Sequence, residues 1–234
     1  KLSKITLPSS LKTIGDSVFS RCENLCYVEL PENLVKIDER LFYSCEKLVS
    51  VFIPQRTEEI GASAFEGCKS LEFVALHKGI IRIKESCFQF CENMKIIIIP
   101  QSIKIISNKA FRHCKAATTL IIQEGVNVIE NDAFAGCKKL AFVSFPKRSL
   151  KKIYSQAFAQ CPELKKVVIP KSCVVENGAF DDGVEIDFLD DEDIFEENDS
   201  EVIQKKTQKK NKKSLSQLNS SKESEEFAFE NVDE

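Results

Sequence analysis

Cysteine and histidine are the residue types here with the widest chemical range, since both serve as nucleophiles and metal ligands. The chain has ten cysteines and two histidines. Seven of the cysteines end a Phe-x-x-Cys pair, and the phenylalanines of successive pairs are 23, 23, 23, 23, 23 and 24 residues apart. The pairs are Phe19/Cys22, Phe42/Cys45, Phe65/Cys68, Phe88/Cys91, Phe111/Cys114, Phe134/Cys137 and Phe158/Cys161. This spacing places the seven cysteines in one repeated register, which an eighth copy continues with Phe180 but without a cysteine.

Two interpretations of this cysteine ladder are open from the sequence. Stacked repeats lie about 4.8 Å apart, and disulfides tolerate Cα separations of about 4.4–6.8 Å, so neighbouring cysteines are near enough to pair. An unbroken row of seven offers no obvious choice of partner, however, and a free cysteine suits a small buried position. We therefore expect reduced core thiols. Cys26, Cys87 and Cys173 lie outside the row, and we expect them to be exposed or semi-exposed.

A metal site is not expected from these cysteines. Zinc requires four ligands that converge in a tetrahedron, whereas a linear row does not converge. The Cys22-x-x-x-Cys26 and Cys87-x-x-x-Cys91 segments offer two ligands each, with no matching second pair close in sequence.

The histidines give no sign of a catalytic site. His113 adjoins Cys114, but a ladder thiol should point inward while His113 points elsewhere. His77 occupies a turn position where other repeats have proline. Neither a phosphate-binding loop nor a nucleophile-elbow motif occurs in the chain. We therefore expect no enzymatic activity, no cofactor and no small-molecule substrate.

The elements that would position these residues follow the same period. After each cysteine comes a short run in which branched apolar residues alternate, and such a period of two indicates a strand with one buried face. Prolines end most of these strands, because proline cannot donate to a ladder. An isoleucine follows within an extended segment, and a helical turn is expected at the Ala-Phe-x-x-Cys corner. The alternating pairs are Val28/Leu30, Val51/Ile53, Val74/Leu76, Ile97/Ile99, Leu120/Ile122, Val143/Phe145 and Val167/Ile169.

One 23-residue unit cannot bury its own apolar face, so stacked units must share a continuous core. The segments Ile53-Pro-Gln-Arg-Thr-Glu-Glu-Ile-Gly-Ala-Ser-Ala-Phe-Glu-Gly-Cys68 and Val126-Asn-Val-Ile-Glu-Asn-Asp-Ala-Phe-Ala-Gly-Cys137 carry a clear resemblance. The pattern resembles the BspA-like leucine-rich repeat family. The resemblance implies a mainly-β or α/β repeat, namely a right-handed leucine-rich-repeat solenoid with short concave strands and little helix. It also implies a surface antigen or adhesin, since family members serve these roles in bacteria and parasitic protists.

Two regions are predicted from the composition. Residues 1–189 should form the solenoid, with about eight coils of which the last is degenerate and capping. Residues 190–234 should form a disordered charged tail, because they are polar and highly charged. Residues 181–234 carry 18 Asp and Glu against 7 Lys, whereas residues 1–180 carry 18 Asp and Glu against 26 Lys and Arg. The lysine run at 205–213 is a candidate targeting signal or nucleic-acid contact, and the acidic segments are candidates to fold back on the basic solenoid.

The ends and apolar runs of the chain give further expectations. It starts at Lys1 in the middle of a repeat, so we expect a fragment of a longer protein. The longest apolar runs, such as Ile96 to Ile99, have four residues, far short of the roughly 18 to 20 that a membrane span needs. No membrane span is therefore expected in this chain.

The strand residues between the buried ones should point outward onto the concave surface. A solvated sheet face is usually polar at such positions, yet here aromatic and aliphatic residues recur and would join into one exposed apolar patch, which tends to mark an interaction site. The alternative is that these residues simply favour strands and pair across the ladder. Lys166 is expected at the rim of the patch. The expected partner-binding residues are Tyr27, Phe52, Phe73, Ile96, Ile98, Ile121 and Phe142.

The function predicted from these features is a non-catalytic protein–protein interaction scaffold that binds a protein of unknown identity on its concave face. The alternatives are an intracellular or nuclear adaptor, or a nucleic-acid-binding protein that uses the basic body and the lysine run. The location stays open, because unpaired cysteines and the absence of a signal or anchor favour the cytoplasm slightly, whereas the family resemblance favours the cell surface.

Overall fold

The computed structural model describes residues 2–190, and these form a solenoid of about eight coils without helix. The coils are numbered here by their ladder phenylalanines, from coil 1 at Phe19 to coil 8 at Phe180. The predicted leucine-rich-repeat solenoid is confirmed. The predicted tail lies outside the described residues, apart from Asp190.

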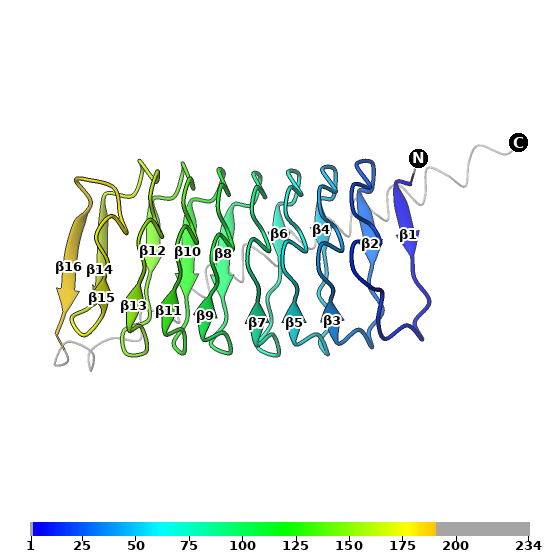
Figure 1. The fold of residues 1–234 in the computed structure, drawn as a ribbon, viewed down its shortest axis with the longest axis horizontal. Coiled ribbons are helices and arrows are strands. Elements are labelled where there is room, and N and C mark those ends of the chain that lie inside the picture. The colour runs from blue at the N-terminus through cyan, green and yellow to red at the C-terminus, as the bar shows by residue number, and fades with distance from the viewer. Residues whose placement is uncertain (1, 191–234) are drawn as a thin grey trace, which may run out of the picture. The chain divides into compact units, whose positions relative to one another are not determined.

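Each full coil contributes one strand to each of two rows (Figure 1). The first row consists of β1 (Lys4–Thr6), β2 (Tyr27–Glu29), β4 (Ser50–Val51), β6 (Phe73–Val74), β8 (Ile96–Ile99), β10 (Thr119–Ile122), β12 (Phe142–Ser144), β14 (Lys166–Pro170) and β16 (Glu185–Leu189). The second row consists of β3 (Lys36–Ile37), β5 (Glu59–Ile60), β7 (Arg82–Ile83), β9 (Ile105–Ile106), β11 (Val128–Ile129), β13 (Lys152–Ile153) and β15 (Val174–Val175).

All strand pairs are parallel, and equivalent residues of successive coils lie in register, as in the row Lys4, Tyr27, Ser50 and Phe73. The first row forms three sheets, β1-β2-β4-β6, β8-β10-β12 and β14-β16. The second row forms two sheets, β3-β5-β7 and β9-β11-β13-β15. Both rows are therefore interrupted between coil 4 and coil 5.

The corner between the second and first rows is where the structure departs from the expected helical turn. Three overlapping turns form instead, with N–H to O bonds from Ala64 to Gly61 (3.3 Å), from Glu66 to Ser63 (3.2 Å) and from Cys68 to Phe65 (3.1 Å). The third residue of the first and of the last turn is left-handed, with φ of 54° at Ser63 and 75° at Gly67. Positive φ at the third position is incompatible with a helix and typical of type II turns.

The left-handed residues recur two positions before and two positions after the ladder phenylalanine of coils 1 to 7. Most of them are not glycine, and a left-handed conformation costs such residues roughly 1–2 kcal/mol each. Stacking must therefore impose the turn. The non-glycine members are Ser17, Arg21, Arg40, Ser44, Ser63, Ser86, Phe90, Lys109, His113, Asp132, Gln156 and Gln160.

The ladder phenylalanines form one continuous stack through the core. Neighbouring rings from Phe19 to Phe180 have centroids between 5.0 Å and 5.6 Å apart and planes within 17° of parallel. Phe65, Phe88 and Phe134 are completely buried. The stack, together with the isoleucines of the second row and the inward residues of the first, forms a single core.

At the C-terminal end of the described solenoid, a carboxylate accepts corner hydrogen bonds that backbone carbonyls of the next coil accept elsewhere. Where earlier corners donate backbone N–H groups to the next coil, the Gln160 and Cys161 N–H groups donate to the two carboxylate oxygens of Asp181, both at 2.7 Å. Strand β16 then pairs with β14 over its whole length.

Candidate functional site

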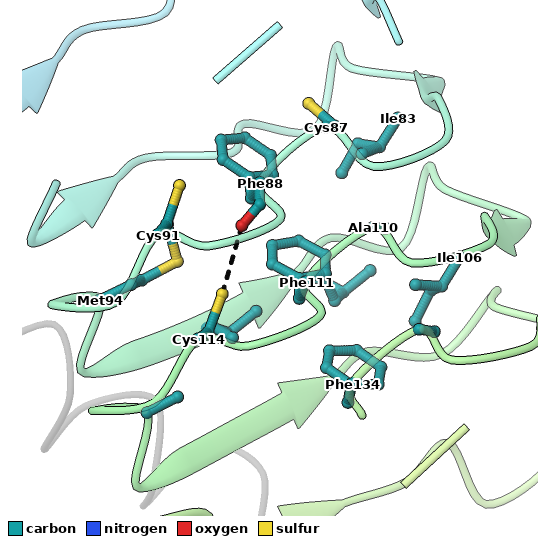
Figure 2. Close-up of a cluster of buried hydrophobic side chains, with 14 of the residues drawn as sticks. Ile83, Cys87, Phe88, Cys91, Met94, Ile106, Ala110, Phe111, Cys114 and Phe134 are labelled. Carbon is teal, nitrogen blue, oxygen red and sulfur yellow. Dashed lines mark hydrogen bonds between the residues drawn. The ribbon is translucent and has the colours of Figure 1, made fainter. Parts of the chain in front are cut away.

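Six of the seven ladder cysteines donate a hydrogen bond to a carbonyl oxygen of the preceding coil. The Cys114 thiol donates to the carbonyl oxygen of Phe88 at 3.4 Å, as Figure 2 shows. The same bond recurs from Cys45 to Phe19 at 3.0 Å and from Cys68 to Phe42 at 3.1 Å. It continues with Cys91, Cys137 and Cys161. The ladder thiols thus act as buried hydrogen-bond donors between coils.

Burial also suppresses the reactivity of these thiols. Desolvation raises the pKa of Cys45 to about 12, and raises the pKa values of Cys68 and Cys91 well above the usual range. A thiolate is the reactive form of cysteine, so these groups are inert at neutral pH. All ten cysteines are free thiols in the structure.

Of the three cysteines outside the ladder, Cys26 is exposed as expected. The expectation is wrong for Cys87 and Cys173, which are 0% and 7% exposed. Cys87 occupies the position directly before Phe88, where most other coils have alanine. Cys173 follows Pro170 by three residues, at the core position that Leu34 fills after Pro31. Both positions are apolar in most other coils, and the Phe-x-x-Cys spacing alone does not contain that signal.

Neither histidine lies in a catalytic arrangement. The Nε2 atom of His77 lies 2.9 Å from the Pro54 carbonyl oxygen, and its Nδ1 accepts the Gly79 N–H at 3.1 Å. These bonds stabilise a turn that begins with proline in most other coils. His113 stacks on Phe90 with ring centroids 4.9 Å apart. Burial, with the neighbouring positive charge of Arg112, lowers the pKa of His113.

Clusters of metal-ligating side chains are absent from the part of the chain that the structure describes. Within 2–190, no three His, Cys, Asp or Glu side chains come together in a way that could hold a metal ion. No helix in the same range has the length and apolar character needed to cross a bilayer.

A recess of about 520 Å³ lies at the corner of coils 1 to 3. Its lining is polar and offers hydroxyl and guanidinium donors beside one carboxylate. These groups could hold a polar ligand, but they form no paired nucleophile and base. The lining residues are Ser17, Ser20, Arg21, Arg40, Tyr43 and Glu66.

The outward side of the first-row strands, called the strand face below, contains the residues predicted to bind a partner. Phe52 and Phe142 are 52% and 44% exposed. Tyr27, Phe73, Ile96 and Ile98 are half-buried on the same side. Val168, at one end of the face, is 39% exposed, and Lys166 is exposed beside it.

Ile121 does not have the exposure expected of a contact residue, since only 6% of it is accessible. It belongs to β10, the middle strand of a three-stranded sheet, and lies in register between Ile98 and Ser144. Neighbours on both sides therefore cover it, which a period-two pattern in the sequence does not reveal.

The centre of the strand face carries no formal charge. Ten successive outward positions are uncharged, although charged residues make up 29% of the chain. With strands about 4.8 Å apart, this uncharged stretch is roughly 20 Å long. Glu29 and Lys166 bound it at the two ends. The ten positions are Ser50, Phe52, Phe73, Ala75, Ile96, Ile98, Thr119, Ile121, Phe142 and Ser144.

A family model for the BspA type leucine-rich repeat region, built of six repeat copies, matches residues 1–118, 58–187 and 104–233. The chain belongs to the BspA-type leucine-rich repeat family. The family predicted from the repeat pattern is thereby confirmed. A comparison with curated proteins gave no match.

Solved structures similar to this BspA-type chain are bacterial repeat proteins. A leucine-rich repeat protein of T. pallidum is 25% identical, with a TM-score of 0.63 over 70% of this chain and 78% of that one. A leucine-rich cell surface protein of Faecalibacterium prausnitzii is 22% identical, with a TM-score of 0.51 over 80% and 69%. A leucine-rich repeat protein of Eubacterium ventriosum is 20% identical, with a TM-score of 0.56 over 80% and 60%. The last two likenesses concern the fold alone.

Proposed function

We propose that this BspA-type chain is a non-catalytic scaffold that binds a protein partner through its strand face. The observation that carries the proposal is the uncharged stretch between Glu29 and Lys166, in which Phe52 and Phe142 are about half exposed. The cores of protein interfaces are depleted in charge and enriched in aromatic residues, and their rims are polar. Repeat proteins commonly bind along the surface that their stacked strands form.

The geometry of the face supports a continuous contact. Phe142 lies in register with Thr119, and Thr119 with Ile96, so one outward row crosses three strands. Phe73 continues a second such row through Ser50 to Tyr27. A partner laid across the strands would meet apolar side chains over most of its contact and charged ones at both ends.

A cell-surface role is the finer form of this proposal. It rests on the family and on the description of the F. prausnitzii protein as a cell surface protein. Extracellular matrix proteins are therefore the first partner class to test.

The test compares binding by the wild-type chain and by two folded variants. Phe52→Asp/Phe142→Asp places charges on the strand face, whereas Ile81→Asp/Ile105→Asp places the same charges on residues of the second-row side, which are 49% and 46% exposed. The proteins are presented to immobilised matrix proteins and to cell extract, and retained proteins are identified by mass spectrometry.

The expected result is a partner that wild type and the Ile81/Ile105 variant retain and the Phe52/Phe142 variant loses. Circular dichroism spectra of the wild type and both variants establish that the three proteins have the same fold. Equal retention by all three would contradict binding through the strand face. Loss by both variants would indicate a partner sensitive to net charge instead.

A further inference from the structure

The boundary between coil 4 and coil 5 differs from the others in its strand pairing. In the first row β6 pairs with β4 but not with β8, and in the second row β7 pairs with β5 but not with β9. At the other boundaries within residues 2–190, at least one of the two rows is paired. The two halves of the solenoid thus meet without a continuous sheet on either side.

Several of the backbone hydrogen bonds that flank the strands at other boundaries are missing between coil 4 and coil 5. In the second row the N–H of Asn127 donates to Lys104 O at 2.8 Å, and Ile81 N–H donates to Glu58 O at 2.8 Å. Farther along the row, Lys84 N–H donates to Ile60 O and Glu130 N–H donates to Ile106 O. At the matched place between coil 5 and coil 4, the donor is a hydroxyl, from Ser107 Oγ to Ile83 O at 2.8 Å.

The first row keeps one backbone bond across this boundary, from Asn93 N–H to Lys69 O at 3.1 Å, but lacks the next one. Thr118 N–H donates to Lys95 O at 2.9 Å, and Glu72 N–H donates to Val49 O at 3.0 Å. Between Lys95 and Glu72 themselves, the contact is an ion pair of the side chains, with Nζ and Oε2 3.3 Å apart. An exposed ion pair is a weaker and looser tether than a ladder bond.

The inward side chains of the first-row strand in coil 4 are less buried than those of the next coil. Val74 and Leu76 are the inward residues of this coil, and both are only partly buried against the core. Their equivalents in the next coil, Ile97 and Ile99, are 2% and 0% exposed. Inward residues with partial exposure indicate that the two coils are in looser contact here.

The corner remains tightly joined across the same boundary. Phe88 stacks on Phe111 at 5.2 Å, with Cys114 bonded to the Phe88 carbonyl (Figure 2). Backbone bonds run from Phe88 N–H to Ala110 O and from Phe90 N–H to Arg112 O, both at 2.8 Å. The corner therefore keeps its backbone hydrogen bonds across this boundary, whereas the two strand rows lack their ladder pairing.

We propose that this boundary is a flexible joint, with the corner at Phe88 and Phe111 as its hinge. The joint divides the solenoid into coils 1–4 and coils 5–8, which move as rigid blocks. Opening separates β6 from β8 and β7 from β9, and so changes the spacing between Phe73 and Ile96 on the strand face. The proposal does not depend on a partner, because it rests on contacts within the chain.

Hydrogen exchange of backbone amides tests the joint in the wild-type protein. The amides of Asn127 and Val128 both donate to Lys104 O, and Lys104 and Ile105 occupy the same positions one coil earlier. A residue-resolved measurement by NMR should find exchange at Lys104 and Ile105 at least about tenfold faster than at Asn127 and Val128.

The corner supplies the internal control. The Phe88 and Phe90 amides should be as well protected as those of Phe111 and His113, which make the same bonds to coil 6. Fast exchange at the strand positions with protection at the corner supports a hinged joint. Equal protection at Lys104 and Asn127 would overturn it, and fast exchange at the corner as well would overturn the hinge in favour of local unfolding of coil 4.

Discussion

Six of the seven ladder cysteines donate a thiol hydrogen bond to a carbonyl group of the preceding coil. The Phe42 oxygen accepts the Cys45 N–H within its own coil at 3.1 Å and the Cys68 thiol of the next coil at 3.1 Å. A carbonyl oxygen has two lone pairs, so both are used. Cysteine suits this position because it is small and apolar yet carries a weak donor. The row therefore has a physical explanation that requires neither disulfides nor metal.

Thiol labelling of the native protein should distinguish the ten cysteines by burial. One cysteine, Cys26, is exposed, Cys22 is half-buried and the other eight are buried. We expect one thiol to react rapidly with an aromatic disulfide reagent, a second to react more slowly, and eight to react only as the protein unfolds, because labelling needs an accessible thiolate. Ten rapid thiols in urea provide the reference. More than two rapid thiols without denaturant would contradict this assignment.

A glycine in a corner turn should be required for space as well as for conformation. Gly136 has φ of 74°, and a Cβ added there would lie 2.1 Å from Nδ1 of His113. Gly183 has φ of 88° but nothing within 4 Å of an added Cβ. We expect Gly183→Ala to cost about 1–2 kcal/mol from backbone strain, and Gly136→Ala to cost about 2–4 kcal/mol because the clash adds to it.

Urea denaturation measures both values. In the Gly136→Ala background, the additional change His113→Ser should recover most of the difference between the two alanine variants. No recovery would mean that strain, not the histidine ring, sets the cost.

At the scale of a single strand, charge in the second row gathers around β5. The Glu59 carboxylate lies 2.9 Å from Lys84 Nζ, 3.5 Å from Arg82 and 4.0 Å from Lys36. The hydrogen bond from Lys84, with the charges of Lys84 and Lys36, lowers the pKa of Glu59. The carboxylate thus connects β5 to strands on both sides, where short two-residue pairings alone would be weak.

The stability of a Glu59→Gln variant should depend on pH in a defined direction. A carboxyl whose folded pKa is lowered stabilises the fold above its unfolded pKa of about 4.3, and this stabilisation is lost as pH falls through the lowered folded value. We expect the variant to be less stable by about 1 kcal/mol at pH 7, since the three cations are largely exposed. The difference should shrink below about pH 4. Urea denaturation across a range of about pH 3 to 7 measures it, and a difference independent of pH would argue against a charge effect.

An element can be predicted from this sequence when the residue pattern that causes it recurs in every coil. The alternation of Val51 and Ile53 is enough to predict a first-row strand with the correct buried side. The prediction of a helical corner is wrong because left-handed residues such as Arg40 and Lys109 give no local signal. Stacking on the next coil imposes their conformation, and one repeat does not encode that.

The candidate site is predictable in part for the same reason. The outward position of Phe52 and Phe142 follows from the period alone. The burial of Ile121 depends on neighbours from two other coils. The partial burial of Val74 depends on the missing pairing between β6 and β8. Alternation looks the same in all of these coils, so it does not distinguish paired boundaries from the open one.

At the scale of the whole solenoid, stability is a sum of coil terms and nearest-neighbour terms. A boundary that lacks ladder bonds in both rows contributes a smaller interaction free energy between the two coils. A destabilising substitution on one side of it therefore has less effect on the coils of the other side. The proposed joint therefore has a thermodynamic consequence in addition to its mobility. Coils 1–4 and coils 5–8 should behave as two partly separate cooperative units.

A core truncation in one block should accordingly remain within it. Phe134 is completely buried in coil 6, and Phe134→Ala should cost about 3–5 kcal/mol. The chain has no tryptophan, so Phe52→Trp and Phe142→Trp, made separately, each give a fluorescent reporter for one block. With Phe134→Ala added, the urea midpoint measured in the Phe142→Trp protein should fall clearly further than the midpoint measured in the Phe52→Trp protein, because the weak boundary limits coupling. Equal shifts of the two midpoints would show that all the coils unfold as one cooperative unit despite the interrupted strands.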